Sequence, residues 1–249
     1  MRYSLRYNAL MTPGYTVPAV TRLFRWLGRP VFRLLFHTLC QVRLQGMENI
    51  PAQGPYLVAI NHVSLYEPPF VLAFWPRPLE AAGAVEIWSR KGQALLARMY
   101  GGIQVHRGEY DRQLIDQMLA AVDAGYPLLI APEGGRTHSI AMRQALPGIA
   151  YIIHKAGLPV IPVGILGTTD DLFSRIKASY LRRGHRPRLE LRVGRPILLP
   201  PVAGHGERRR QALQTNVDCI MAHIGALLPS EYHGFYASQV AALLPEVDL

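Results

Sequence analysis

A histidine and a carboxylate that could share a proton stand in one polar segment, at His62 and Glu67. Neutral imidazole can take a proton from an alcohol near pH 7, and a carboxylate on its other nitrogen fixes the tautomer and stabilises the cation that forms. The same His-x4-acid spacing occurs at two other places, His106/Asp111 and His185/Glu190. On spacing alone, the simpler interpretation is a histidine that caps a turn and a solvated acid at a helix start.

The residues around His62 and Glu67 predict a strand that runs into a helix. Residues 56–60 are apolar and follow the turn sequence Gln-Gly-Pro, which is typical of a buried strand. Pro68 and Pro69 suit the first turn of a helix, where no backbone donor is needed. The pair is therefore predicted on a strand-to-helix turn, where open α/β sheets hold their ligands.

Two further strand ends carry residues that can bind an anion. Residues 103–105 are a short predicted strand that ends before Arg107. Residues 128–130 are a buried predicted strand, and four residues suited to anion binding follow it, namely Glu133, Gly134, Gly135 and Arg136. Paired glycines let backbone N–H groups approach an anion, and arginines bind phosphate by charge-assisted hydrogen bonds. Arg107 could instead form a surface salt bridge, and residues 133–136 could be a plain turn. Each alternative is reasonable by itself, but it is less reasonable that all the strand ends lack a function.

Strands alternate with helical segments along most of the chain. Helices are predicted over residues 111–124, 148–156 and 207–228, and further strands over 160–165 and 189–193. This alternation predicts an α/β fold with a largely parallel sheet covered by helices. In such a sheet the strand ends named above share one edge, so we expect a histidine base beside a phosphate cradle. Residues 81–100 are interpreted as helix and loop, and residues 232–249 as a tail.

Residues 16–41 form a predicted amphipathic helix. Its apolar residues recur at helical spacing on one face, namely Val20, Leu23, Leu27, Val31 and Leu34, and its arginines fall on the opposite face, namely Arg22, Arg25, Arg29 and Arg33. Such a helix can lie in a membrane interface, or it can be an ordinary surface helix docked on the core. The predicted division is a membrane-associating segment over residues 1–43 and a main domain over residues 44–249.

Length and composition narrow the class of protein. The 249 residues, 49% of them hydrophobic, suffice for one α/β domain or two small ones. The two cysteines lie far apart in the sequence, so they indicate neither a disulfide framework nor a metal site. Residues 1–15 lack the apolar core of a secretory signal, and no apolar run approaches the ~18–20 residues of a membrane span. We therefore expect neither a signal peptide nor a transmembrane segment.

The charge indicates an anionic partner. The net charge is +10, and 24 arginines stand against 3 lysines, with seven arginines before the first acidic residue, Glu48. Such a chain is attracted to lipid headgroups, nucleic acid or a phosphorylated substrate. No RNA-binding aromatic motif, zinc-ligand spacing or coiled-coil basic region favours nucleic acid. The charge leaves an anionic membrane surface and a phosphorylated substrate as the partners to expect.

The chain resembles the glycerolipid acyltransferase family, of the lysophosphatidic acid acyltransferase type. Residues 61–68 match the family's first block, His-x4-Asp after an asparagine, and residues 102–107 match its second block, which ends in arginine. Residues 132–137 match its Pro-Glu-Gly-Thr-Arg-Ser block, and residues 160–163 match the fourth, an apolar run around proline. The four blocks appear in the family's order and together are specific, whereas any one alone would not be.

The resemblance implies transfer of a fatty acyl group to the hydroxyl of a lysophospholipid, such as 1-acylglycerol-3-phosphate, in phospholipid biosynthesis. The donor would be the thioester of acyl-CoA or of acyl-carrier protein. His62 would be the general base and Glu67 its orienting partner. The residues that would hold the acceptor's phosphate end are Arg107, Glu133, Gly134, Gly135 and Arg136. The family uses no metal, so we expect no cofactor beyond the thioester co-substrate.

The family tends to have membrane-associating helices before its first block, which favours the interfacial interpretation of residues 16–41. We expect a peripheral or monotopic protein on the cytoplasmic face of a membrane. Two residues depart from the family pattern. Glu67 stands where aspartate is usual, and Gly135 stands where threonine is usual, which removes a hydroxyl from the predicted acceptor site.

Two other functions remain open from the sequence. A non-catalytic module that binds anionic membranes would account for the charge, but not for the residues at the strand ends. A thioester hydrolase could use His62 and Glu67 to activate water instead of a lipid hydroxyl. Product analysis separates hydrolysis from transfer, because only transfer requires an acceptor.

Overall fold

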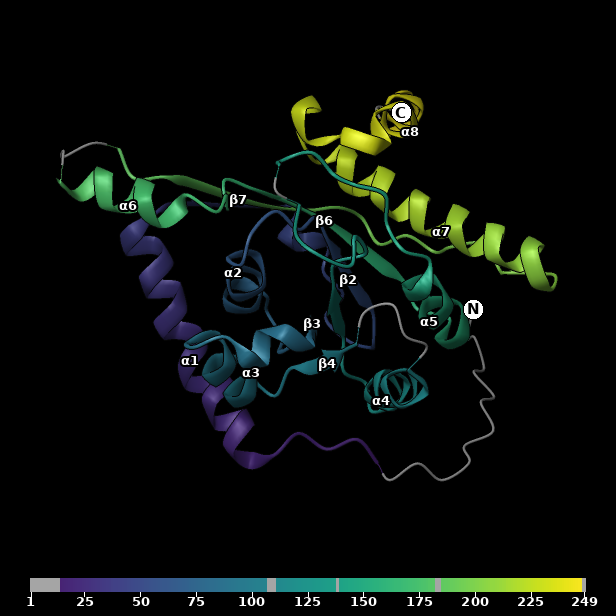
Figure 1. The fold of residues 1–249 in the computed structure, drawn as a ribbon, viewed down its shortest axis with the longest axis horizontal. Coiled ribbons are helices and arrows are strands. Elements are labelled where there is room, and N and C mark those ends of the chain that lie inside the picture. The colour runs from purple at the N-terminus through teal and green to yellow at the C-terminus, as the bar shows by residue number, and fades with distance from the viewer. Residues whose placement is uncertain (1–13, 107–110, 138, 182–184, 248–249) are drawn as a thin grey trace.

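A computed structural model describes residues 14–247 except 107–110, 138 and 182–184. Its strands form one seven-stranded sheet in the order β1-β7-β6-β2-β5-β3-β4 (Figure 1). The strands are β1 (Gln41–Gln45), β2 (Leu57–Ile60), β3 (Glu80–Ala84), β4 (Ile103–Val105), β5 (Leu128–Ile130), β6 (Val160–Leu166) and β7 (Arg188–Val193). Neighbouring strands pair in parallel, except that β6 and β7 are antiparallel. The predicted α/β fold with a largely parallel sheet is confirmed.

Helices cover both faces of this sheet. They are α1 (Ala19–Leu39), α2 (Glu67–Phe74), α3 (Gln93–Tyr100), α4 (Arg112–Asp123), α5 (Gly148–Ala156), α6 (Leu172–Leu181), α7 (Gly206–Ala226) and α8 (Ala237–Val247). Alternate residues of β2 point to opposite faces. Leu57 and Ala59 pack in a core with α4, α5 and α7, whereas Val58 and Ile60 pack in a second core with α1 and α2.

Two segments differ from their predicted structure. Residues 81–100 were expected to be helix and loop, but the first of them belong to β3, although Glu-Ala-Ala-Gly-Ala has no β-branched or aromatic residue. The strand forms because β5 and β4 pair with it on its two sides. The predicted tail is also wrong, because short 3₁₀ turns and α8 pack onto α7. There the fully buried Tyr236 accepts a hydrogen bond from Ala145 N (2.8 Å) and donates one to Asp218 (3.0 Å).

The amino-terminal segment also contributes a strand that was not predicted. β1 pairs in parallel with β7, from Gln41 opposite Arg188 to Gln45 opposite Arg192. The predicted division between residues 43 and 44 therefore runs through a strand of the sheet. Among the described residues, no helix is long and apolar enough to cross a bilayer.

α1 docks on the domain through a buried ion pair. Arg25, 4% exposed, places its two terminal nitrogens 2.5 and 2.7 Å from the carboxylate of Glu80, which is fully buried at the start of β3. Tyr15 donates a further hydrogen bond to the same carboxylate at 2.7 Å. The buried charge of Arg25 is thus compensated by a carboxylate, as buried charges must be.

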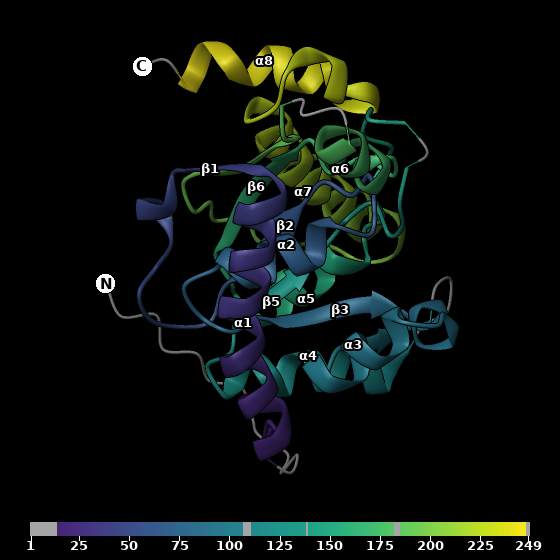
Figure 2. The same cartoon turned by 90° about the vertical axis from the view of Figure 1, so that its left-hand side faces the viewer.

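Three of the four arginines of α1 point toward the protein, Arg22 is exposed, and the apolar face points away from the protein. Arg33 Nε donates to the backbone oxygen of Ala73 at 2.5 Å, and Arg29 donates to the backbone oxygen of Trp75. The large apolar residues of the opposite face are exposed, namely Val20, Leu23, Leu27, Val31 and Leu34. α1 runs along one side of the molecule (Figure 2). α1 thus docks on the core, as one of the two interpretations predicted, but it does so with the face that carries Arg25, Arg29 and Arg33.

Candidate active site

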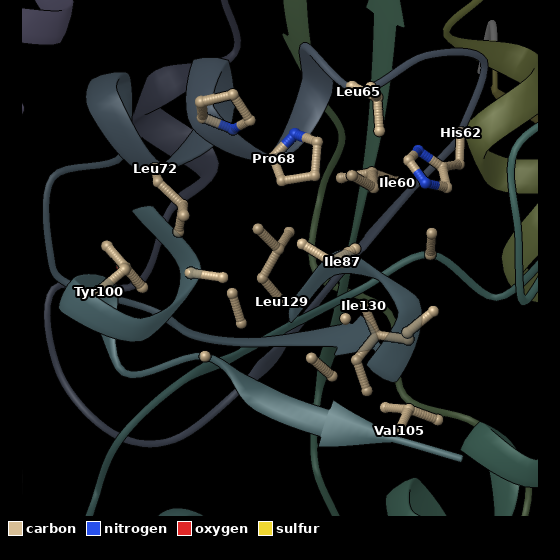
Figure 3. Close-up of a pocket in the computed structure, with 18 of the residues that line it drawn as sticks. Ile60, His62, Leu65, Pro68, Leu72, Ile87, Tyr100, Val105, Leu129 and Ile130 are labelled. Carbon is tan, nitrogen blue, oxygen red and sulfur yellow. The ribbon is translucent and has the colours of Figure 1, made fainter. Parts of the chain in front are cut away.

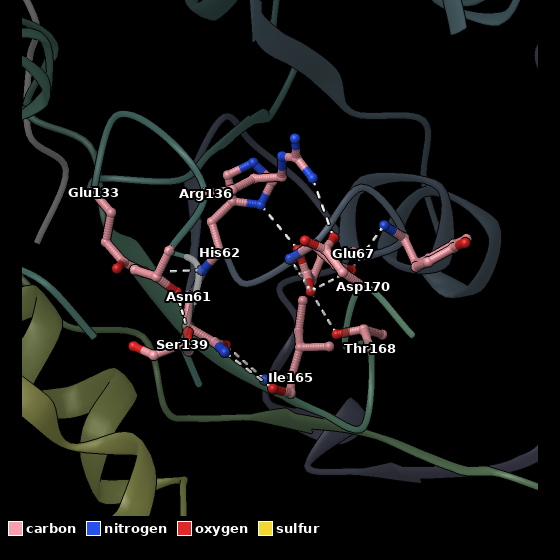
Figure 4. A network of polar contacts seen from close by, with 12 residues as sticks. Asn61, His62, Glu67, Glu133, Arg136, Ser139, Ile165, Thr168 and Asp170 are labelled. Carbon is pink, nitrogen blue, oxygen red and sulfur yellow. Dashed lines mark hydrogen bonds and ion pairs between the residues drawn. The ribbon is translucent and has the colours of Figure 1, made fainter. Parts of the chain in front are cut away.

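His62 and Glu67 meet at the carboxyl end of β2, as their positions on a strand-to-helix turn predict. His62 Nδ1 lies 2.9 Å from Glu67 Oε2 (Figure 4). Glu67 is fully buried at the first residue of α2, where the helix dipole favours a negative charge. Within the described part of the chain, no group bonds to His62 Nε2, so this nitrogen remains available to a ligand.

Three donors besides His62 hold the Glu67 carboxylate. Ser64 contributes its backbone N–H, 2.9 and 3.0 Å from the two oxygens, and its hydroxyl, 3.0 Å from Oε1. Thr168, which follows β6, donates its hydroxyl to Oε1 at 2.5 Å. Charge-assisted hydrogen bonds of this kind fix a carboxylate firmly. The orientation of the imidazole is therefore set by residues from two separate strand ends.

The side chain of Asn61 connects the same two strand ends by binding the backbone of Ile165. Its side-chain amide donates to Ile165 O at 3.0 Å, and its side-chain oxygen accepts from Ile165 N at 2.8 Å. Asn61 is fully buried, and a buried amide side chain needs such partners. The asparagine before His62 thus fixes the turn that carries the histidine.

Both carboxylate oxygens of Glu133 are hydrogen-bonded to backbone N–H groups of the protein. Its carboxylate oxygens accept hydrogen bonds from His62 N at 2.9 Å and Arg143 N at 3.0 Å. Burial raises the pKa of the Glu133 carboxyl, and the backbone N–H groups of Arg143 and His62 partly oppose that rise. Because both oxygens contact the protein, we interpret Glu133 as a residue that positions His62. Its predicted contact with the acceptor phosphate stays a prediction.

Gly134, Gly135 and Arg136 lie at the end of β5, next to His62. Gly134 has a φ of 66°, and a Cβ there would approach Leu146 to 2.7 Å, so the turn requires glycine. Thr137 N donates to His62 O at 3.0 Å, which holds this segment against the turn that carries the histidine. The predicted phosphate-binding residue Arg107 lies outside the described residues.

Arg136 has an acidic partner that the sequence did not indicate. Its Nη1 lies 3.1 Å from Asp170 Oδ1, and both side chains are partly exposed, at 24% and 54%. Asp170 stands two residues after Thr168, which contacts Glu67. The carboxyl edge of the sheet thus presents a positive and a negative group together (Figure 4).

An apolar cavity of about 520 Å³ runs beside the histidine. Figure 3 places His62 at one side of it and Tyr100 at the other. Gly134 and Gly135 line it near His62, and most of its other walls are apolar side chains from α1, α2, α3, α4 and α5. A cavity of this kind suits a hydrocarbon chain, because burying it removes apolar surface from water.

In the two other His-x4-acid pairs, the acid has a structural role. Asp111 caps α4 by accepting a hydrogen bond from Leu114 N at 3.0 Å. Glu190 forms ion pairs with Arg188 at 2.6 Å and Arg192 at 2.8 Å. In the described ranges, no three His, Cys, Asp or Glu side chains cluster as metal ligands would.

Sequence reasoning missed several residues of the site, although one signal was available. Thr168 is the third residue after a predicted strand, as Glu133 is after the strand over residues 128–130. Arg143 and Asp170 carried no such signal, because neither stands at the end of a predicted strand. Their places depend on how the loops after β5 and β6 fold over the sheet edge.

Comparison with known proteins agrees with this geometry. A family model described as "Acyltransferase" matches residues 41–166. The lyso-ornithine lipid O-acyltransferase of Pseudomonas aeruginosa is 30% identical over 237 residues, which cover 88% of this chain and 85% of that protein. The crystal structure of the 1-acyl-sn-glycerophosphate (LPA) acyltransferase PlsC from Thermotoga maritima is similar, with a TM-score of 0.52 and 21% identity. That similarity covers 80% of this chain and 78% of the other, and it concerns the fold.

Proposed function

The chain belongs to the acyltransferase family, and we propose that it transfers a fatty acyl group from a thioester donor to the hydroxyl of a lysolipid. The observation that carries this proposal is the pair His62–Glu67, with Nδ1 held by a buried carboxylate and Nε2 directed to an apolar cavity. A base of this kind can remove the proton of an alcohol while the alcohol oxygen attacks an activated carbonyl.

In the proposed reaction, the lysolipid hydroxyl gives its proton to His62 Nε2 while its oxygen attacks the thioester carbonyl carbon. Glu67 stabilises the imidazolium through Nδ1–H. Collapse of the tetrahedral intermediate breaks the carbon–sulfur bond, and the leaving thiolate takes the proton back from His62. The ester and a free thiol leave, and the histidine returns to its starting form. The enzyme itself carries no acyl group at any step.

The acyl chain of the donor is proposed to lie in the apolar cavity, with its carbonyl at the His62 end. A chain in that position places the reacting carbon near Nε2 and keeps the rest away from water. The donor is the thioester of coenzyme A or of acyl-carrier protein.

The proposed acceptor is a lysophospholipid, with 1-acylglycerol-3-phosphate first. Its phosphate would contact Arg136, Arg107 and the backbone N–H of Gly135. Gly134, whose N–H donates to Ala131 O at 3.1 Å, would let the backbone approach closely. A second candidate is a lysolipid with an amino-acid headgroup, which one observation favours. Asp170 already pairs with Arg136 and compensates its charge, so the two offer complementary contacts to a carboxylate and an ammonium. The P. aeruginosa relative is named for such a lipid.

The proposed site of action is the cytoplasmic face of a membrane, reached through α1. Its exposed apolar face can enter the interface while Arg25, Arg29 and Arg33 hold the helix to the domain. These three arginines contact the protein, so the proposed attachment to the membrane depends on the apolar face and not on them.

Incubating the purified protein with labelled acyl-CoA or acyl-carrier protein and a panel of lysolipids tests the proposal. We expect a labelled diacyl product. Labelled fatty acid formed equally without acceptor would indicate the hydrolase, and no turnover with any donor or acceptor would indicate the membrane-binding module. Asp170→Asn discriminates between acceptors: it should weaken use of lyso-ornithine lipid, and it should not weaken use of 1-acylglycerol-3-phosphate.

A further inference from the structure

α3 exposes three large apolar side chains, and of these only Leu96 also lines the cavity that the proposed function uses. Leu95 is 62% exposed, Leu96 is 43% exposed and Met99 is 40% exposed. Residues three and four positions apart lie on the same side of a helix, so Met99 is the neighbour of both Leu96 and Leu95. None of the residues of α3 is fully buried. A contiguous exposed apolar side marks a contact with a partner or a membrane, unlike single exposed leucines.

α3 packs against α1. Arg25 Nε donates to Tyr100 O at 2.9 Å, and the Arg25 guanidinium lies 4.5 Å from the centre of the Tyr100 ring. Gly101 approaches Thr21 so closely that a Cβ there would lie 3.0 Å from its methyl group. Figures 1 and 2 both show α3 beside one half of α1.

The charged side chains within residues 87–106 are all positive, and the exposed Glu86 stands just before them. Arg90, Lys91 and Arg98 are exposed, and residues 87–106 contain no acidic residue. Basic side chains beside exposed leucines complement an anionic lipid surface, which offers phosphate groups next to hydrocarbon. A protein partner with an acidic groove is a different class of occupant, and the test below makes it an outcome.

The inner sides of the same two helices line the cavity. α3 contributes Leu96, Ala97 and Tyr100, and α1 contributes Phe24 and Gly28. We propose that α3 is a second membrane-contacting element, which enters the lipid interface beside α1 and brings the walls of the cavity to the bilayer. The proposal extends the proposed function, since a donor's acyl chain then passes from lipid into the cavity with little exposure to water.

Vesicle binding by the full chain tests this inference. Leu95→Ser/Met99→Ser changes two exposed residues that do not line the cavity, and we expect about tenfold weaker partitioning to neutral and anionic phosphatidylcholine-based vesicles alike. Arg90→Gln/Lys91→Gln/Arg98→Gln should weaken binding only to vesicles that contain phosphatidylglycerol. The matched control is Leu198→Ser, which removes a leucine that is 74% exposed outside both helices and should change neither. Thermal unfolding of each variant verifies that it is folded.

A depth measurement makes the test independent of affinity. Leu95→Trp, in a Trp26→Phe/Trp88→Phe background that keeps only the fully buried Trp75, places an indole on α3, and brominated lipids should quench its added emission strongly. The indole of Leu198→Trp in the same background should be quenched little.

Unchanged partitioning of Leu95→Ser/Met99→Ser, or equal quenching at the two positions, would overturn the inference. So would a dimer, seen by analytical ultracentrifugation without lipid, that this double variant abolishes, because α3 would then contact a second copy. Full vesicle binding by both the serine and the glutamine variants would show that α3 does not contact lipid. An acidic protein partner would then be the occupant that the exposed leucines and basic residues fit. All these measurements use no substrate, so a failure of acyl transfer would leave the inference standing.

Discussion

Glu67 and Glu80 are both fully buried carboxylates, and each pairs with a nitrogen-containing side chain, but the two pairs have different roles. Glu67 pairs with His62, whose ring reaches the cavity and is 15% exposed. Glu80 pairs with Arg25, which is 3% exposed at its side chain. An imidazole can gain and lose a proton near pH 7, whereas a guanidinium does not. The first pair is therefore suited to chemistry, and the second to fastening α1 to the sheet.

The largest expected effect tests the first of these pairs. His62→Ala should lower kcat/KM by ~10²–10⁴-fold, because it removes the proposed general base. Its thermal unfolding midpoint should hardly change, since Ser64 and Thr168 still hold Glu67. His185→Ala is the matched control, because it removes an exposed histidine from another His-x4-acid pair. Equal activity in both variants would contradict the role of His62.

Arg25→Ala should show the opposite pattern, with loss of stability first. Removing one partner of a buried ion pair leaves an uncompensated charge and costs ~3–5 kcal/mol in the free energy of unfolding. Arg22→Ala, an exposed arginine of the same helix, should cost almost nothing. Urea unfolding measures both. Arg25→Leu/Glu80→Leu should recover most of the loss, because no charge then remains buried. Equal unfolding free energies for Arg25→Ala and Arg22→Ala would break the comparison.

Thr168→Val tests whether the contacts of Glu67, unlike those of Glu80, serve catalysis. It removes the hydroxyl that donates to Glu67 and keeps the side-chain shape. A hydrogen bond to a charged group contributes ~1.5–3 kcal/mol, so we expect kcat to fall by roughly 10–150-fold. The pH dependence of kcat should move as well, because Glu67 then holds His62 differently. Thr168→Ser should restore both. A loss of stability with an unchanged pH profile would show that Thr168 only supports the fold.

The smallest effect concerns Glu133, a third buried carboxylate, whose direct partners are backbone N–H groups. Burial raises its pKa above the ordinary value of 4.5, so the folded state keeps the proton to higher pH than the unfolded state does. Stability from this group is present below pH 4.5 and is lost as pH rises through the folded pKa. Glu133→Gln should flatten this part of the stability profile, whereas the exposed Glu207→Gln should not. Chemical unfolding at several pH values measures the slope.

Local patterns predicted the elements whose residues decide their own structure. The turn from β2 into α2 could be predicted because apolar residues, His62 and two prolines follow one another within a few positions. α4 could be predicted from its spacing, and it buries Met118, Leu119 and Val122 as an amphipathic helix ordinarily does. β3 could not be predicted from its composition, because it depends on pairing with β4 and β5.

The sequence by itself determined that His62, Glu67 and residues 133–136 end parallel strands, because strand and helix periodicity are local properties. It also determined that α1 has one apolar and one arginine face. Only the tertiary structure decided which face docks. Glu80 and the backbone oxygens of Ala73 and Trp75 come from distant positions, and together they satisfy three arginines that periodicity alone places on the outside. Burial of a charge depends on such partners, and sequence spacing does not reveal them.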